Sequence, residues 1–393
     1  MSVAKAISEQ LEQASWIRRM FEEGDRLRAV RGAANVFDFT LGNPDVEPPE
    51  AVIEALRLVV ERNRPRSHGY MPNAGFPEVR ELMARRMQRE TGLPYTANHV
   101  LMTVGSAAAM NVVLKSLLDP GDEVIVLLPY FPEYRFYIEN HGGRVVPVDT
   151  DGNFLPDVER IARAITPRTK AIILNSPNNP SGAVYPAEAL KELDGLISSL
   201  GQPVTAISDE PYKALVFDGL AVPEVPALIN RTVTAFSWSK AMAISGERIG
   251  YLAISPRLPE AEALRNACTF TNRILGYVNA PAIWQWVMAE EADATVDVQL
   301  YQKKRDLMCG GLQRIGYDFR KPQGTFYVFP RTPIPDDVAF IRALLAEGIL
   351  AVPGSGFGRP GHFRLSLTVP HDVIERSLPG FERAFQAVTT LTA

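Results

Sequence analysis

Residues 232–254 read TVTAFSWSKAMAISGERIGYLAI, in which two short apolar runs flank a polar stretch. The first run, Thr232 to Phe236, leads into Ser237-Trp-Ser-Lys240, and the second, Ile249 to Ile254, follows directly after Arg248. Short runs rich in β-branched and aromatic residues are typical of buried strands. We therefore expect two strands here, with a cluster of polar side chains at the end of the first.

The same pattern extends over residues 100 to 255, where strand-like runs alternate with segments of helical period. The earlier runs are Leu101 to Val104, Val124 to Leu128, Ala171 to Leu174 and Val204 to Ser208. This alternation predicts an α/β domain around a largely parallel sheet. Past about residue 285 the pattern changes to a long charged helical segment, Ile283 to about Gln313, followed by two strand-like segments. A second, smaller α+β unit is expected there.

Composition limits the classes of protein to consider. A chain of 393 residues that is 46% hydrophobic can bury a large core and a smaller one. Its 41 basic and 45 acidic residues form no long run, which disfavours a nucleic-acid partner. Two cysteines cannot make a disulfide framework, and neither a signal peptide nor a run of about 20 apolar residues is present. We expect a soluble cytoplasmic protein with no membrane partner.

Three strand-like runs end in polar residues of different chemistry. Asn179 lies in the turn after the run that ends at residue 174, Asp209 and Tyr212 follow the next run, and Ser237 and Lys240 follow the one after that. In open α/β sheets, ligands bind beyond the carboxyl ends of the strands. If these strands are neighbours, the polar groups meet in one crevice.

This set of side chains suits pyridoxal 5′-phosphate (PLP). A lysine can form the Schiff base, a carboxylate can hold the pyridinium nitrogen, and an amide and a phenol can bind the ring oxygen. A buried aspartate beside a cationic nitrogen stays ionised and keeps that nitrogen protonated. For the phosphate, backbone N–H groups of Gly105-Ser106-Ala107 open a predicted helix, and Ser237 and Arg248 add a hydroxyl and a cation.

The spacing of Lys240 and Arg248 resembles the lysine signature of class I aminotransferases. Ser-Trp-Ser-Lys240 is followed eight residues later by Arg248-Ile-Gly-Tyr. Other motifs of that family recur in order between residues 40 and 370: Gly42-Asn-Pro-Asp, Tyr70, Gly105-Ser106-Ala107, Phe131, Asn179-Pro180-Ser-Gly182, Asp209 with Tyr212, and Arg364. Lys213, beside Tyr212, lacks an arginine at the family spacing. Lys240 is therefore the candidate for the Schiff base.

The resemblance implies the fold type I architecture and a homodimer with shared active sites. The large PLP-binding domain, with a mostly parallel seven-stranded sheet flanked by helices, would span residues 46–284. The smaller α+β domain would combine residues 1–45 and 285–393 from both chain ends. Cis peptide bonds at Asn179-Pro180 and Leu128-Pro129 are also expected, because the family often uses them beside the cofactor.

The resemblance also implies roles for individual residues. Phe131 would stack on the pyridine ring, where many relatives have tryptophan, while Asn179 and Tyr212 would bind the ring oxygen. Tyr70 would reach the phosphate in the neighbouring subunit. The substrate would be bound by Gly42, Asn179 and Arg364, with Arg364 holding the α-carboxylate. Simpler alternatives stay open for several residues: Asp209 as a helix N-cap, Arg364 as part of a structural ion pair, Asn179 as a turn residue only, Phe131 as a core residue and Tyr70 as a loop anchor.

The activity implied is amino-group transfer between an L-amino acid and a 2-oxo acid, with 2-oxoglutarate as an expected acceptor. A PLP-dependent β-lyase on the same fold is the alternative, because fold does not fix reaction type. A PLP-binding transcription regulator is disfavoured, since only about 40 residues precede Gly42. The five histidines show no metal-ligand spacing, so no metal site is expected.

Arg273 is the candidate for substrate specificity. It precedes the turn Asn279-Ala-Pro281. Some dicarboxylate-specific relatives have an arginine at a similar place, where it reaches across the dimer to the distal carboxylate of the substrate. The spacing here differs by about one residue, and an ion pair at the surface or interface is the alternative role.

Overall fold

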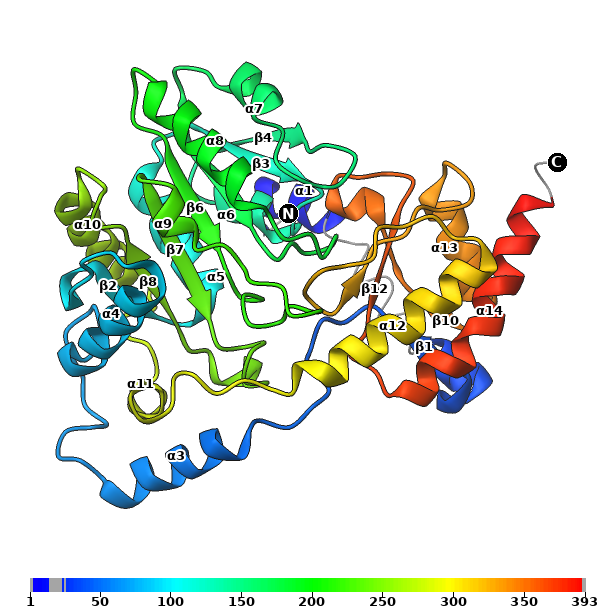
Figure 1. Ribbon diagram of the computed structural model, residues 1–393, viewed down its shortest axis with the longest axis horizontal. Coiled ribbons are helices and arrows are strands. Elements are labelled where there is room, and N and C mark those ends of the chain that lie inside the picture. The colour runs from blue at the N-terminus through cyan, green and yellow to red at the C-terminus, as the bar shows by residue number, and fades with distance from the viewer. Residues whose placement is uncertain (1–2, 14–22, 25, 391–393) are drawn as a thin grey trace.

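A seven-stranded sheet forms the centre of the computed structural model, which describes residues 3–13, 23–24 and 26–390 (Figure 1). The strand order is β2-β8-β7-β6-β5-β3-β4. Only β8 runs antiparallel to its two neighbours, so the predicted mostly parallel sheet is confirmed. The strands are β2 (Val100–Thr103), β3 (Glu123–Leu128), β4 (Arg144–Asp149), β5 (Thr169–Asn175), β6 (Thr205–Asp209), β7 (Thr232–Ser237) and β8 (Gly250–Ile254).

Helices cover both faces of this sheet, because alternate residues along each strand enter opposite cores. In β5, Ala171 and Ile173 face one core and Ile172 and Leu174 face the other. The first core takes in α5 (Gly105–Leu117), α6 (Glu133–Glu139) and α10 (Ala261–Ile274). The opposite face carries α7 (Val158–Ala164), α8 (Ala187–Ser199) and α9 (Val225–Leu228), with α3 (Glu50–Arg62), α4 (Pro77–Thr91) and α11 (Ala282–Glu290) over β2 and β8.

The elements after α11, together with β1, form a separate layered unit (Figure 1). It contains the three-stranded sheet β11-β12-β9 and the two-stranded sheet β1-β10, in which segments far apart in the sequence pair in parallel. Its core also takes in Tyr212 and Leu215, which follow β6. The predicted domain boundaries remain a prediction. The elements are β1 (Phe37–Asp38), α12 (Val298–Ile315), β9 (Tyr327–Val328), α13 (Asp337–Ala346), β10 (Ile349–Leu350), β11 (Val352–Pro353), β12 (Phe363–Ser366) and α14 (His371–Thr389), and α1 (Lys5–Gln13) precedes them all.

The long helix predicted from Ile283 to Gln313 is wrong, because two helices occupy this stretch. Helix α11 ends at Glu290, and α12 begins only at Val298. Between them the Glu291 side chain accepts hydrogen bonds from the backbone N–H groups of Asp293 and Ala294. Asp297 then caps α12 by accepting from Gln299 N at 2.9 Å. Side-chain carboxylates that accept hydrogen bonds from the local backbone compete with helical hydrogen bonds, which accounts for the break.

Both predicted cis peptide bonds, Leu128-Pro129 and Asn179-Pro180, are confirmed, and Ser176-Pro177 is a third that was not predicted. Within the described residues, no helix combines the length and apolarity that a membrane span requires.

Candidate active site

The carboxyl edge of the sheet holds a cavity of about 190 Å³. Strand order changes direction between β3 and β5, because β4 lies on one side of this pair and β6 and β7 lie on the other. The loops that follow strands diverge at such a switch point and leave a crevice. The structure brings nine of the predicted site residues to this cavity: Ser106, Ala107, Phe131, Asn179, Asp209, Tyr212, Ser237, Lys240 and Arg248.

Asp209 is the buried carboxylate of this cavity, with 5% of its surface exposed. Its Oδ2 accepts a hydrogen bond of 2.5 Å from the Tyr134 hydroxyl, whereas its Oδ1 has no partner in the described part of the chain. Burial raises the pKa of Asp209 to about 7, against the lowering effects of the Tyr134 hydroxyl and of the nearby Ser106 side chain. Asp209 ends β6 and the next helix begins only at Val225, so the helix-cap alternative is wrong.

Lys240 faces the same cavity from the turn after β7. Its Nζ donates a hydrogen bond of 2.6 Å to the carbonyl oxygen of Gly42. Burial, with repulsion from Arg248 and Arg364, lowers the pKa of Lys240 to about 8. A lysine with a lowered pKa is partly neutral near physiological pH, and only the neutral amine is a nucleophile.

Backbone N–H groups, hydroxyls and a guanidinium form an anion-binding corner. Helix α5 begins at Gly105, whose φ is +79° and whose missing Cβ would lie 3.0 Å from Arg248 Nη2. Glycine thus lets the guanidinium approach the helix N-terminus. Ser237 Oγ lies 2.7 Å from Ser239 Oγ, and Arg248 Nη1 donates to the Ser245 carbonyl oxygen at 2.7 Å. Such a corner suits a phosphate group.

Arg364, on β12, approaches the site from the smaller unit. It is 5% exposed, donates to Asn179 Oδ1 at 3.2 Å, and lies over the Tyr327 ring at 4.5 Å. Its Nε has no partner, and no carboxylate among the described residues pairs with it, so the structural ion pair that was the alternative is not found. Burying a cation without an anion is costly, so a carboxylate ligand would compensate it.

Two aromatic side chains complete the walls. The Tyr212 hydroxyl lies 3.1 Å from the Tyr327 hydroxyl, and burial raises the pKa of Tyr212 well above its ordinary value. Phe131 packs edge-on against Tyr134, with ring centroids 5.6 Å apart.

Comparison with known proteins identifies the family. Residues 34–379 match the family described as aminotransferase class I and II. This chain belongs to that family.

Its relatives are similar over almost their whole length. The aminotransferase is 37% identical over 367 residues to the aspartate/prephenate aminotransferase of Thermus thermophilus, covering 91% of this chain and 93% of that one. An aromatic-amino-acid aminotransferase from Thermococcus litoralis is 28% identical, with 97% and 98% covered. Among solved structures, an aminotransferase from Eubacterium rectale superposes with a TM-score of 0.95 at 36% identity, covering 98% of this chain and 99% of that one. The T. thermophilus aspartate aminotransferase with maleate gives a TM-score of 0.83 at 34% identity, with 94% and 96% covered.

Five predicted site residues do not line this cavity. Gly42, Gly105 and Arg364 lie next to residues that do, whereas Tyr70 and Arg273 lie away from it. Tyr70 is 95% exposed on the loop before α4. Arg273, in the last turn of α10, is exposed and lies over the Phe270 ring at 5.4 Å. Both were predicted to act across a subunit interface, so their position away from this chain's own cavity agrees with that expectation without testing it.

Several lining residues of the aminotransferase were not predicted as site residues: Tyr134, Tyr137, Asn175, Ser239 and Ser245. Asn175 carried a usable signal, because it ends β5 just as Asp209 ends β6 and the two are register partners. Its Nδ2 donates to the Asp209 backbone oxygen at 2.9 Å. No sequence signal marked Tyr134, because its contact with Asp209 depends on the fold that brings α6 to the end of β6.

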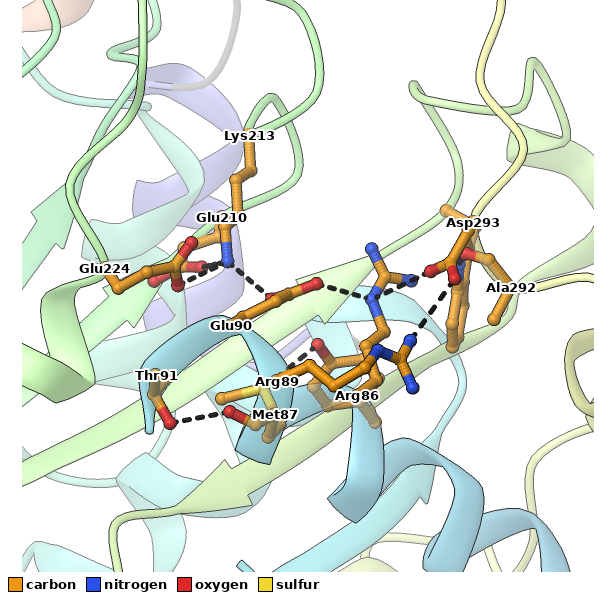
Figure 2. A network of polar contacts seen from close by, with 12 residues as sticks. Arg86, Met87, Arg89, Glu90, Thr91, Glu210, Lys213, Glu224, Ala292 and Asp293 are labelled. Atoms are coloured by element: carbon orange, nitrogen blue, oxygen red, sulfur yellow. Dashed lines mark hydrogen bonds and ion pairs between the residues drawn. The ribbon is translucent and has the colours of Figure 1, made fainter. Parts of the chain in front are cut away.

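Lys213 occupies a different environment, shown in Figure 2. Its Nζ contacts Glu224 at 2.6 Å, Glu90 at 2.9 Å and Glu210 at 3.7 Å. Burial alone would lower the pKa of Lys213, but the three carboxylates outweigh it and the pKa is raised. Lys213 therefore remains an ammonium ion held by acidic side chains, which excludes it as the nucleophile.

Proposed function

We propose that this aminotransferase binds PLP through Lys240 and transfers an amino group between an L-amino acid and a 2-oxo acid, with 2-oxoglutarate as an acceptor. The observation that carries the proposal is Asp209 Oδ1, which lies buried in the same cavity as Lys240 and has no hydrogen-bond partner among the residues that the structure describes. A carboxylate in that position needs a cationic partner, and a protonated ring nitrogen supplies one.

The remaining groups suit the other parts of the cofactor. Asn179 and Tyr212 would bind the ring oxygen, and Phe131 would cover a ring face. The phosphate would lie in the corner formed by residues 105–107 with Ser237 and Arg248.

When bound, PLP supplies an electron sink that makes the α-hydrogen of the amino acid acidic. Arg364 would bind the α-carboxylate, since a planar guanidinium can donate two parallel hydrogen bonds to it. This contact would fix the orientation of the α-carbon. Lys240 Nζ, once released from the cofactor, would take the α-proton, and its pKa of about 8 is near the value that suits a general base at neutral pH.

A direct test is to reduce the holoenzyme with borohydride and map the labelled peptide. Label on Lys240 supports the proposal, whereas label on Lys213 or on no lysine contradicts it. The holoenzyme mixed with a single amino acid should convert to the pyridoxamine form and stop until a 2-oxo acid is added. Continuous release of ammonia and pyruvate from one substrate would indicate a lyase instead.

Arg273 is proposed to select dicarboxylates from across the dimer interface. Its guanidinium is exposed, and the related T. thermophilus structure carries maleate, a dicarboxylate. Arg273→Ala should lower kcat/KM for aspartate and glutamate by about ten- to a hundredfold per lost charge-assisted hydrogen bond, and barely affect alanine. An equal loss for all three substrates, or none, would reject this role and leave a surface or interface ion pair.

The dimer that this role requires is itself part of the proposal. Tyr70 is 95% exposed, and Phe270 and Ile274 on α10 are 52% and 51% exposed in the single chain. Symmetric dimers bury such surfaces by placing the same patch on both subunits. Light scattering of the holoenzyme should give twice the chain mass, and a monomer would contradict the shared site.

A further inference from the structure

The loop that presents Tyr70 is fastened at its carboxyl side by three amide side chains. Residues 71–76 follow Tyr70 and pack against the connection between α10 and α11. The amides are those of Asn272, Asn279 and Gln285, which together we call the amide clamp. Each bonds to the backbone of the Tyr70 loop.

Asn272 joins the loop to the end of α10. Its Nδ2 donates to the carbonyl oxygens of Asn73 and Val278, both at 3.1 Å. The residue is 1% exposed, so both hydrogen bonds are shielded from water. Shielded hydrogen bonds are costly to break, because each leaves a buried polar group without a partner.

Gln285 bonds the other end of the loop to the start of α11. Its Oε1 accepts from Phe76 N at 3.0 Å, and its Nε2 donates to the Ala280 carbonyl oxygen at 2.9 Å. The side chain is fully buried, and a Cβ on Gly75 would lie 2.8 Å from its Oε1. Gly75 therefore allows the loop to pass close to the amide.

Asn279 completes the clamp nearest to Tyr70. Its Nδ2 donates to the Pro72 carbonyl oxygen at 3.0 Å. The preceding residue, Val278, has a φ of +61°, which is strained for a β-branched side chain. Such strain persists only where surrounding contacts hold the backbone in place.

We infer that the amide clamp is a positioning device for the active site of the second subunit. The Tyr70 side chain is 95% exposed in the single chain, yet the backbone just beyond it is held by three separate amides. A loop held this way presents Tyr70 at a fixed place to a partner. The inference rests on the proposed dimer with shared active sites, and on the role that the family resemblance implies for Tyr70, which is to reach the phosphate in the neighbouring subunit.

The clamp also links Tyr70 to Arg273. Asn272 immediately precedes Arg273, and the same amide holds Asn73, three residues after Tyr70. One hydrogen-bonded unit thus carries both residues that are proposed to cross the interface.

Hybrid dimers separate action in trans from a general structural effect. Two differently tagged chains are co-expressed, one carrying Lys240→Ala, and the mixed dimer is purified. Only one active site of the mixed dimer retains Lys240, and that site receives Tyr70 from the Lys240→Ala chain. Asn272→Ala is then placed either on that chain (in trans to the working site) or on the intact chain (in cis). Half-reaction kcat/KM and the rate of PLP dissociation are measured for each hybrid.

Asn272→Ala in trans should lower kcat/KM by about tenfold and speed PLP dissociation, because a misplaced contact group loses much of its effect. The same change in cis should leave both quantities at the parent hybrid's values. Asn279→Ala, a less buried position, should give the same asymmetry and provides the test if Asn272→Ala does not fold. The matched control is Asn230→Ala, which removes an amide that bonds to Asp194 and not to the Tyr70 loop. In trans it should leave kcat/KM and the rate of PLP dissociation unchanged.

Tyr70→Phe in trans distinguishes the two ways of failing. If it slows the hybrid while the clamp variants in trans do not, the inference is overturned and the role of Tyr70 stands. If Tyr70→Phe in trans has no effect, the proposed role of Tyr70 fails and the inference fails with it. Equal losses in cis and in trans for the clamp variants would mean general destabilisation and would also overturn the inference.

Discussion

Lys240 and Lys213 both follow strands of the same sheet, and both are largely buried, yet their surroundings give them opposite properties. Lys240 has two arginines near it and a pKa lowered to about 8. Lys213 has three carboxylates around it and a raised pKa. The comparison shows that burial alone does not make a lysine reactive. The sign of the neighbouring charges decides whether the side chain is a nucleophile or a structural cation.

The two environments meet in one turn. Asp209 points into the cavity, while Glu210, the next residue, accepts a hydrogen bond of 2.7 Å from Ser208 and pairs with Lys213. Figure 2 shows that Glu90 and Arg86 extend the second environment to α4. The ion-pair network therefore anchors the turn whose other side carries Asp209, the carboxylate proposed to hold the ring nitrogen.

The largest expected effect separates the two lysines by chemistry. Lys240→Ala should lower turnover by about 10⁴-fold, because it removes the side chain proposed as both covalent anchor and proton carrier. Lys213→Ala should keep the half-reaction rate of the folded enzyme within about tenfold of wild type, since its network touches the site only through the turn. Single-turnover absorbance measurements compare them. Similar losses in the two variants would break the distinction.

The next effect separates the neighbouring carboxylates. Asp209→Asn should slow α-proton removal by about 10³-fold, because the ring nitrogen loses its charged partner. Glu210→Gln should change the urea midpoint of unfolding far more than it changes the rate of the half-reaction. Stopped-flow half-reactions and urea unfolding of both variants provide the measurement. A near-normal rate in Asp209→Asn would remove this carboxylate from the chemistry.

A third effect concerns stability. Lys213→Met should lower the free energy of unfolding by about 3 kcal/mol, because it leaves the buried Glu210 and the half-buried Glu90 and Glu224 without their shared cation. The control is Lys321→Met, which breaks an exposed pair with Asp306 and should cost about 1 kcal/mol or less. Urea denaturation of both variants at neutral pH tests the difference. Equal losses of unfolding free energy in the two variants would show that burial does not strengthen the ion pairs of Lys213.

Much of this comparison was visible in the sequence. Strand-like runs ending in Asn179, Asp209 and Lys240 predicted the convergence, because parallel strands align their carboxyl ends on one edge. The rejection of Lys213 rested on spacing to an arginine, and the structure supplies the physical reason. The carboxylates that hold Lys213 come from α4, from its own turn and from the segment before α9.

What the sequence could not predict depends on long-range packing. Tyr134 reaches Asp209 only because α6 packs beside the end of β6. The break between α11 and α12 arises from local hydrogen bonds of Glu291 and Asp297, which a helical period in the apolar residues does not reveal. The amide clamp likewise joins residues 71–76 to residues 272–285, and no sequence motif predicted these contacts.

The smallest expected effect tests the charges directly in the cofactor-free protein. Between pH 7 and pH 8, the neutral fraction of Lys240 should rise about fivefold, because its pKa is lowered to about 8. The rate of modification by trinitrobenzenesulfonate, mapped by mass spectrometry, should rise in proportion, while Lys213 should remain unmodified because its pKa is raised.

The lowered pKa of Lys240 should also make the stability of the cofactor-free protein increase with pH. Between about pH 8 and 10.5 the folded state binds fewer protons at Lys240 than the unfolded state, so the free energy of unfolding should gain a positive contribution as pH increases. Lys240→Met should lack that contribution. Modification of Lys240 that begins only near pH 10, or identical pH profiles for the wild type and Lys240→Met, would show that its surroundings do not lower its pKa.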